Sequence, residues 1–344
     1  MRLESVSQVG PFGSIHCMLP LHTLRIVMAR EHRRGKLFQM ARPIAAFLRL
    51  TRPIFLLGGV VLYALGGQVA RYQGVEIDWE VYLLGQLAVT AVQLVGQYVN
   101  EYFDVETDRL TAHRTLFSGG SGVLSAGVLP RRVALIAALV CGAIGISAMA
   151  ALAVSFDAVP LSWLVFLLAL AGAWAYSGPP VSLESSGIGE LTTSLIVALL
   201  VPSMAYTLQT ASISLLVVLA AVPLVSLHWA MVVAFEFPDY DADRKAGKRT
   251  VLVRLGHKRT ASLHLVTTMG AFGLLLASTV ISVPWTVAAP AMAMLPFAGV
   301  VVFLVRKAAR GEQAPYGWLT FGAVSLFAIT ASLQAIGFYV ASRF

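Results

Sequence analysis

Nine stretches of the chain are apolar over lengths that would cross a lipid bilayer. A helical crossing takes about 17–25 such residues, and in hydrocarbon a segment of this kind is helical because it must satisfy its own backbone hydrogen bonds. The sequence therefore predicts an all-α integral membrane protein with about nine transmembrane helices. The segments are centred on residues 53–70, 81–103, 133–155, 160–177, 189–207, 213–235, 262–282, 286–305 and 318–340.

The low content of charged residues supports this interpretation. Only 12% of the 344 residues are charged, whereas soluble domains carry about 25%. So few charges cannot cover a water-facing surface of this size, so we expect the bilayer to surround most of the chain. The composition excludes a soluble domain or scaffold.

The positive charges are unevenly distributed. Of the 25 Lys and Arg residues, 23 fall in the N-terminal segment through Arg52 and in the connections after 81–103, 213–235 and 286–305. In the nine-helix arrangement these regions share one side, and basic connections stay in the cytoplasm. We therefore predict a multi-pass protein of the cell inner (cytoplasmic) membrane, with the N-terminus and these connections cytoplasmic. Topology accounts for the net charge of +8, and no nucleic acid partner is expected.

Residues 1–45 differ from the rest. They lack the apolar core and cleavage site of a signal peptide. We interpret them as a cytoplasmic N-terminal extension, either disordered or the product of a start codon placed before the true start at Met28 or Met40. Residues 46–344 are predicted to form a single transmembrane domain. The sequence does not define the oligomeric state.

Two acidic clusters of identical spacing end the second and sixth segments, and each reads Glu-x-x-Asp-x-acidic-x-Asp-Arg. Within each cluster the spacing i, i+3, i+7 places three acids on one helical face. One such cluster would be interpreted as a solvated helix end, but two matched clusters favour a binding site. The first contains Glu101, Asp104, Glu106 and Asp108, and the second contains Glu236, Asp239, Asp241 and Asp243.

Carboxylates that share a helical face repel one another, so a cation is expected between them. Mg²⁺ binds carboxylate oxygens together with phosphate oxygens, and Mn²⁺ has similar preferences. The two clusters, which we expect at the cytoplasmic ends of helices 2 and 6 of the nine, could hold one diphosphate through bridging Mg²⁺ or Mn²⁺ ions.

Polar and basic residues near the clusters extend the predicted site. Gln86, Gln93, Gln97 and Asn100 form a stripe that runs from the first cluster into the membrane; it lines either a wet cavity or a hydrogen-bonded helix interface. The loop 118–122, Ser-Gly-Gly-Ser-Gly, could bring backbone N–H groups to an anion. Basic residues after the clusters either contact phosphate or only mark topology: Arg109, Arg114, Arg244, Lys245, Lys248 and Arg249.

At these residues the sequence resembles the UbiA superfamily of intramembrane prenyltransferases. Residues 100–108 fit that family's Asn-x-x-x-Asp-x-x-x-Asp motif, and residues 239–243 with their basic tail resemble its Asp-x-x-x-Asp motif. Tyr176-Ser-Gly-Pro-Pro180 and Gly187-Ile-Gly-Glu190 are similar to the connection between the family's fourth and fifth helices. The resemblance covers residues 45–344.

Two positions depart from the family pattern. Phe235 and Glu236 stand where some members have an Asn, so that metal contact is absent. The segment 181–190 has no basic residue, although many members carry Lys or Arg there. A phosphate contact from that loop would have to come from elsewhere in this chain.

The resemblance implies Mg²⁺-dependent transfer of a prenyl group from an allylic prenyl diphosphate. It implies that Asn100, Asp104, Asp108, Asp239 and Asp243 are the metal ligands and catalytic residues. Residues 100–104 and 118–124 resemble most the menaquinone branch, whose aromatic acceptor is 1,4-dihydroxy-2-naphthoate. Other branches use 4-hydroxybenzoate, homogentisate, chlorophyllide, haem or glycerol phosphate lipids. Gln97, Tyr176 and the six basic residues above are the expected substrate-binding residues.

Two alternatives remain open from the residues alone. Acidic residues in apolar segments also occur in ion-coupled transporters, but transporters bind near the bilayer midplane, whereas these acids lie at helix ends. His228, two turns before Glu236, is either a hydrogen-bonded core histidine or a general base.

Overall fold

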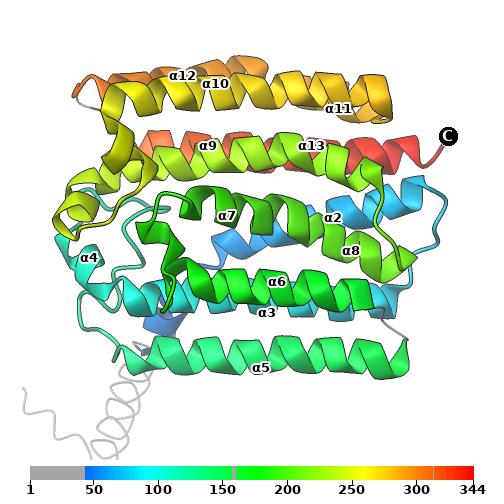
Figure 1. Cartoon of the computed structure of the whole chain (residues 1–344), viewed down its shortest axis with the longest axis horizontal. Coiled ribbons are helices and arrows are strands. Elements are labelled where there is room, and N and C mark those ends of the chain that lie inside the picture. The colour runs from blue at the N-terminus through cyan, green and yellow to red at the C-terminus, as the bar shows by residue number, and fades with distance from the viewer. Residues whose placement is uncertain (1–42, 157–159, 313) are drawn as a thin grey trace, which may run out of the picture. The chain divides into compact units, whose positions relative to one another are not determined.

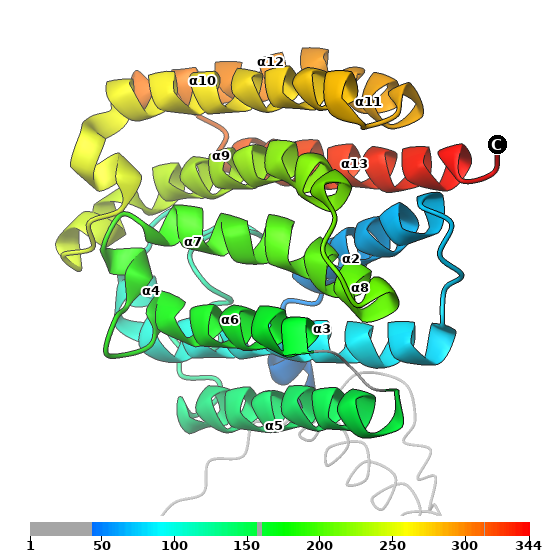
Figure 2. The ribbon, with the colours of Figure 1, turned by 45° about the vertical axis from the view of Figure 1, so that its right-hand side comes forward.

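The computed structural model describes residues 43–156, 160–312 and 314–344. The prediction for the N-terminal extension therefore falls almost entirely outside the described residues. Within them the chain is helical without a β-strand, which confirms the all-α class. The helices of the unit Ala46–Phe344 run side by side along one direction (Figures 1 and 2).

The helices follow the apolar segments closely. After a helical stretch at 43–51, the elements are α2 (Ile54–Tyr72), α3 (Trp79–Phe103), α4 (Val105–Leu110), α5 (Arg132–Ser155), α6 (Pro160–Ser177), the 3₁₀ turn η1 (Leu183–Ser185), α7 (Gly189–Leu195), the π-helical turn η2 (Ile196–Leu200), α8 (Val201–Thr210), α9 (Leu215–Lys245), α10 (Val251–Ile281), α11 (Trp285–Met292), α12 (Leu295–Ala309) and α13 (Tyr316–Ala341).

Seven helical segments of the described chain are long and apolar enough to cross a membrane, and eight if α11 and α12, bent by 43°, form one crossing. The α3 helix is absent from this set although it has 25 residues, because its glutamines lower its apolar character. The predicted number of nine is therefore not reached by length and composition. In α5 the apolar side chains of Ile136, Leu139 and Val140 are exposed, as is expected of a helix that faces lipid. The protein is a multi-pass membrane protein.

The second acidic motif lies within a continuous helix, but the first does not. Residues 236–243 are all within α9, which continues to Lys245. In contrast, α3 ends at Phe103, and Asp104 adopts φ −89°, ψ 5° before the short helix α4 begins. Glu101, Asp104 and Asp108 are expected to share one helical face. The helix is interrupted at Asp104, although Asp104 N–H still donates to Asn100 O (2.9 Å) and Asp108 N–H to Asp104 O (2.8 Å).

The connections that carry the site meet at one end of the bundle. The ends of α3 and α9 and the α9–α10 connection lie together there, at the left in Figure 1. Thr320 of α13 hydrogen-bonds Thr115 (3.2 Å), and Arg249 N–H donates to Ser185 O (3.2 Å). In α10, Gly256 interrupts the helix with φ 73° and ψ 165°, a conformation that glycine adopts without a Cβ clash.

Candidate active site

A cavity of about 540 Å³ lies between the central helices. Its wall is built from α2, α3, α6, α7, η2, α8, α9 and α13, which also contribute much of the apolar core. At one end it is lined by polar residues of both acidic motifs: Asn100, Asp104, Asp108, Glu236, Asp239 and Asp243. The fold thus brings two motifs that are more than 100 residues apart to one enclosed space.

The central aspartate of each motif is contacted by the loop that follows the other motif. Asp104 Oδ1 accepts from Nζ of Lys248 at 2.8 Å, and Lys248 follows the second motif. Asp239 Oδ2 accepts from the backbone N–H of Gly119 at 3.0 Å, and Gly119 follows the first motif. The two half-sites are therefore held together by reciprocal contacts.

The glutamate that opens each motif holds its own following loop. Glu101 accepts from Ser121 N–H at 2.6 Å and from Ser121 Oγ at 2.7 Å. Glu236 accepts from Leu252 N–H at 2.6 Å, at the start of α10. Both carboxylates are buried, and hydrogen bonds to a charged acceptor are the stronger ones. These bonds fix the loops that supply Gly119 and Lys248.

The glycine loop lies directly against Asp108. A Cβ on Gly120, where φ is +67°, would collide with the Asp108 carboxylate. Burial, and to a smaller extent the nearby carboxylates of Asp104 and Glu101, raise the pKa of Asp108 to about 7. A carboxyl group in this position is short of positive charge and would gain from a cation.

Asn100 and a third acidic residue complete the first half-site. Asn100 Nδ2 donates to Asp104 Oδ2 at 2.7 Å, to Ser177 Oγ at 3.0 Å and to Glu184 Oε2 at 3.1 Å. Glu184 also lies 3.2 Å from Nζ of Lys248. Burial opposes the charged form of Lys248, but Asp104 and Glu184 outweigh it and raise the pKa of the lysine. Lys248 is therefore a buried cation shared by two carboxylates.

Among the predicted substrate-binding residues, Gln97, Tyr176 and Lys248 line the cavity, and the other five do not. Arg109 is exposed and pairs with Glu106 at 2.9 Å. Arg114 donates to Gly119 O at 2.6 Å and Asp108 O at 2.8 Å, so it supports the glycine loop from outside. The other three basic residues are exposed outside the cavity: Arg244, Lys245 and Arg249.

Three charged residues of the lining lie outside both the acidic clusters and the predicted site. Arg52 lies just before α2, Glu184 lies in η1 of the α6–α7 connection, and Glu190 lies in the first turn of α7. Glu190 accepts from Val251 N–H at 3.0 Å. The sequence offered one signal for this loop, its lack of basic residues, and the structure places a carboxylate there.

The polar stripe of α3 follows the cavity away from the acidic end. Gln93 and Gln97 line it, and the Oε1 atoms of both are buried without a hydrogen-bond partner among the described residues. His228 also lines the cavity, with Nδ1 3.0 Å from Ser194 Oγ. These groups provide unused hydrogen-bonding capacity beside apolar walls.

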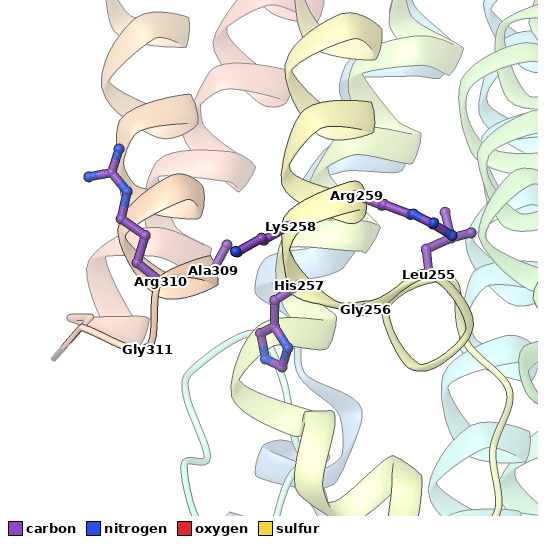
Figure 3. Close-up of a pocket in the computed structure, with 8 residues that line it drawn as sticks. All are labelled: Leu255, Gly256, His257, Lys258, Arg259, Ala309, Arg310 and Gly311. Carbon is purple, nitrogen blue, oxygen red and sulfur yellow. The ribbon is translucent and has the colours of Figure 1, made fainter.

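A second pocket lies at the surface between the start of α10 and the end of α12 (Figure 3). Three cations, Lys258, Arg259 and Arg310, are among the eight residues that line it, and none of the eight is acidic. Figure 3 shows these side chains spread around the opening rather than converging. Carboxylates thus line the cavity between the central helices and not this surface pocket.

The cavity between the central helices has the types of ligand that a hard divalent cation requires. Asp239 Oδ1 is buried with no hydrogen-bond partner in the described chain, and the neighbouring donors are carboxylate and amide oxygens. As the side chains stand, no three His, Cys, Asp or Glu residues among those described are close enough to share one ion. At Asp104 the ammonium group of Lys248 occupies the position beside the carboxylate.

Comparison with protein families gives one match. The model of the UbiA prenyltransferase family covers residues 60–322, which include both acidic motifs.

Two curated relatives are both named 1,4-dihydroxy-2-naphthoate octaprenyltransferase. The one from Bacillus subtilis is 25% identical over 242 residues, 70% of this chain and 71% of the relative. The one from Mycobacterium tuberculosis is 28% identical over 242 residues, 69% of this chain and 78% of the relative. A solved structure of a UbiA homolog from Archaeoglobus fulgidus, bound to GPP and Mg²⁺, superposes with a TM-score of 0.63 at 18% identity, covering 87% of this chain and 100% of that one. At this identity the structural match shows the fold alone.

Proposed function

The chain belongs to the UbiA prenyltransferase family, and from this premise we propose that it transfers a prenyl group from an allylic prenyl diphosphate to 1,4-dihydroxy-2-naphthoate. The observation that carries the proposal is that both acidic motifs line one cavity, which continues along α3 into the apolar core. The acceptor is suggested by the names of the two curated relatives.

The acidic end of the cavity suits a diphosphate. Asn100, Asp104, Asp108, Asp239 and Asp243 would hold Mg²⁺, which when bound supplies Lewis acidity to the departing diphosphate. Two cations of the chain, Lys248 and Arg52, line the same space and would contact phosphate oxygens. Gly119 and Gly120 also line this space, so backbone N–H groups of their loop would contact the bound diphosphate.

The remaining cavity suits the prenyl chain and the acceptor. Apolar side chains of α2, α3, α6 and α8 line it, so water is excluded from the carbon that loses the diphosphate. When the carbon–oxygen bond breaks, the diphosphate takes the electron pair, and an acceptor ring carbon forms the new bond to the allylic cation. That ring carbon then loses its proton, or its carboxyl group as CO₂, and the ring becomes aromatic again. Tyr176 and Phe235 also line this space, and the face of an aromatic ring attracts a nearby cation. Gln97 is placed to hydrogen-bond the acceptor.

The test uses membranes that contain the full chain, radiolabelled prenyl diphosphates and a panel of acceptors. We expect product from 1,4-dihydroxy-2-naphthoate that requires Mg²⁺ or Mn²⁺ and stops when EDTA is added. If product forms instead from 4-hydroxybenzoate, homogentisate, chlorophyllide or a glycerol phosphate lipid, the proposed acceptor is wrong but the proposed prenyl transfer stands. Undiminished transfer in EDTA would contradict the metal role.

We also propose that the acidic end of the cavity faces the cytoplasm of a cell inner membrane, because 23 of the 25 basic residues lie in the N-terminal segment and the connections assigned to that side. A single cysteine introduced at Ala246, in a chain without Cys17 and Cys141, tests this. An impermeant maleimide should label this cysteine only after the cells are permeabilised. Labelling in intact cells would show that the acidic end faces the opposite side of the membrane.

A further inference from the structure

Among the described residues, Lys248 is the one cationic side chain that forms an ion pair with a motif carboxylate lining the cavity. Its Nζ lies 2.8 Å from Asp104 Oδ1 and 3.2 Å from Glu184 Oε1. The lysine, aspartate and glutamate side chains are only 12%, 13% and 8% exposed. Water therefore screens this triad weakly, and whatever occupies the space beside Asp104 must be positive.

Hydrogen bonds hold the backbone on both sides of Lys248, whereas only ion pairs hold its ammonium group. Lys248 N–H donates to Asp243 O at 2.9 Å, and Arg249 N–H donates to Ser185 O at 3.2 Å. At the start of α10, Glu190 and Glu236 accept from the N–H groups of Val251 and Leu252. The four-carbon stem of lysine is flexible, so the ammonium group can change partners without movement of the loop.

Glu184 is suited to keep the ammonium group when Asp104 does not. Its Oε2 is held by Ser177 Oγ at 2.8 Å and Asn100 Nδ2 at 3.1 Å, which leaves Oε1 for the lysine. Glu184 comes from η1, outside both acidic motifs. One of the two partners of Lys248 thus belongs to the metal motifs and the other does not.

We infer that Lys248 is an exchangeable cation that neutralises Asp104 while the divalent metal is absent and moves to Glu184 when the metal binds. This inference rests on the proposed function, since it takes Asp104 as a metal ligand. The lysine released from Asp104 then becomes available to the diphosphate. Exchange makes metal and diphosphate bind cooperatively, and it prevents unpaired carboxylates from remaining buried between turnovers.

The experiment measures Mn²⁺ affinity of the full chain in detergent by electron paramagnetic resonance, without any diphosphate. Lys248→Met removes the competitor, so we expect Mn²⁺ to bind about tenfold tighter or more. Arg249→Gln removes the same charge from the adjacent exposed position and should change the affinity by less than about threefold. Equal changes in the two variants would overturn the exchange, because they would reduce it to a general field effect.

A double-mutant cycle tests the part assigned to Glu184. Glu184→Gln should weaken Mn²⁺ binding about tenfold in the native background, because the displaced lysine loses its second partner. In the Lys248→Met background the same change should have an effect below about twofold, since coupling through the lysine is then absent. Equal weakening in both backgrounds would show that Glu184 acts on the metal directly and would overturn the exchange.

A second readout uses inorganic pyrophosphate as the probe. Pyrophosphate should increase the Mn²⁺ affinity of the native chain by a larger factor than that of Lys248→Met. Mn²⁺ binding by none of these proteins would end both the exchange and the metal role in the proposed function. If the double-mutant cycle gives the expected result but the chain does not prenylate 1,4-dihydroxy-2-naphthoate, only the acceptor assignment is wrong. Unchanged far-UV circular dichroism identifies the variants that are folded.

Discussion

The two acidic motifs have the same spacing in sequence but different environments in the fold. The first is broken at Asp104, where α3 gives way to α4, while the second is continuous within α9. Asp104 is contacted by a charged lysine, whereas Asp239 is contacted by a neutral backbone N–H and keeps Oδ1 unpaired among the described residues. The difference teaches that matched sequence motifs need not make equivalent half-sites, because the partner that each receives comes from elsewhere in the chain.

The largest effect is expected when the central aspartates lose their charge. Asp104→Asn and Asp239→Asn should each lower prenyl transfer by about 10³-fold or more, since each removes a charge that acts on the developing diphosphate. Membrane insertion should be unaffected. Asp241→Asn is the matched control, because Asp241 is an exposed acid of the same helix, and it should stay within about twofold. Nearly native transfer by either central variant would show that its half-site is dispensable.

The next effect concerns the glycine loop, which serves both motifs. Gly120→Ala should lower transfer about 10- to 100-fold, because the added methyl group would meet the Asp108 carboxylate. Gly127→Ala is the control for backbone strain, since Gly127 has a similar φ of +70° but nothing within 4 Å of the added atom. Steady-state transfer rates of the two variants, compared at equal protein levels, measure the contact. Equal losses would assign the effect to strain alone.

A smaller effect distinguishes the glutamates that hold the two loops. Glu101 uses both oxygens, on Ser121, whereas Glu236 uses one, on Leu252. Glutamine can still accept one bond. Glu101→Gln should therefore destabilise the protein by about 1–2 kcal/mol and Glu236→Gln by less than about 1 kcal/mol. Thermal unfolding midpoints in detergent give the order, and the reverse order would mean that the second loop depends more on its glutamate.

The smallest effect is expected at Arg109. Its ion pair with Glu106 is 52% and 72% exposed, and exposed pairs contribute no more than about 1 kcal/mol. Arg109→Gln should therefore change the Michaelis constant for the prenyl diphosphate by less than about twofold. A much larger increase would place Arg109 at the phosphate during turnover and return it to the substrate-binding set.

Sequence patterns predicted the features that depend on local chemistry. Apolar runs located the helices, and the paired spacing selected the aspartates that line the cavity. The break at Asp104 could not be predicted from the acidic spacing, because the second motif has the same spacing within a continuous helix. Glu184 was missed because it has no acidic neighbour at a helical spacing. Arg109 was selected for adjacency to an acidic cluster, but α4 directs it outward, toward Glu106.

The reciprocal contacts affect when the site can form during synthesis of the chain. Asp104 leaves the ribosome 144 residues before Lys248, and Gly119 leaves it 120 residues before Asp239. During synthesis the end of α3 must therefore wait, with its acids uncompensated, until most of the later helices have entered the bilayer. Chains grow at about 5–20 residues per second, so the interval lasts on the order of ten seconds. A nascent chain stalled before residue 248 would hold Asp104 without its lysine.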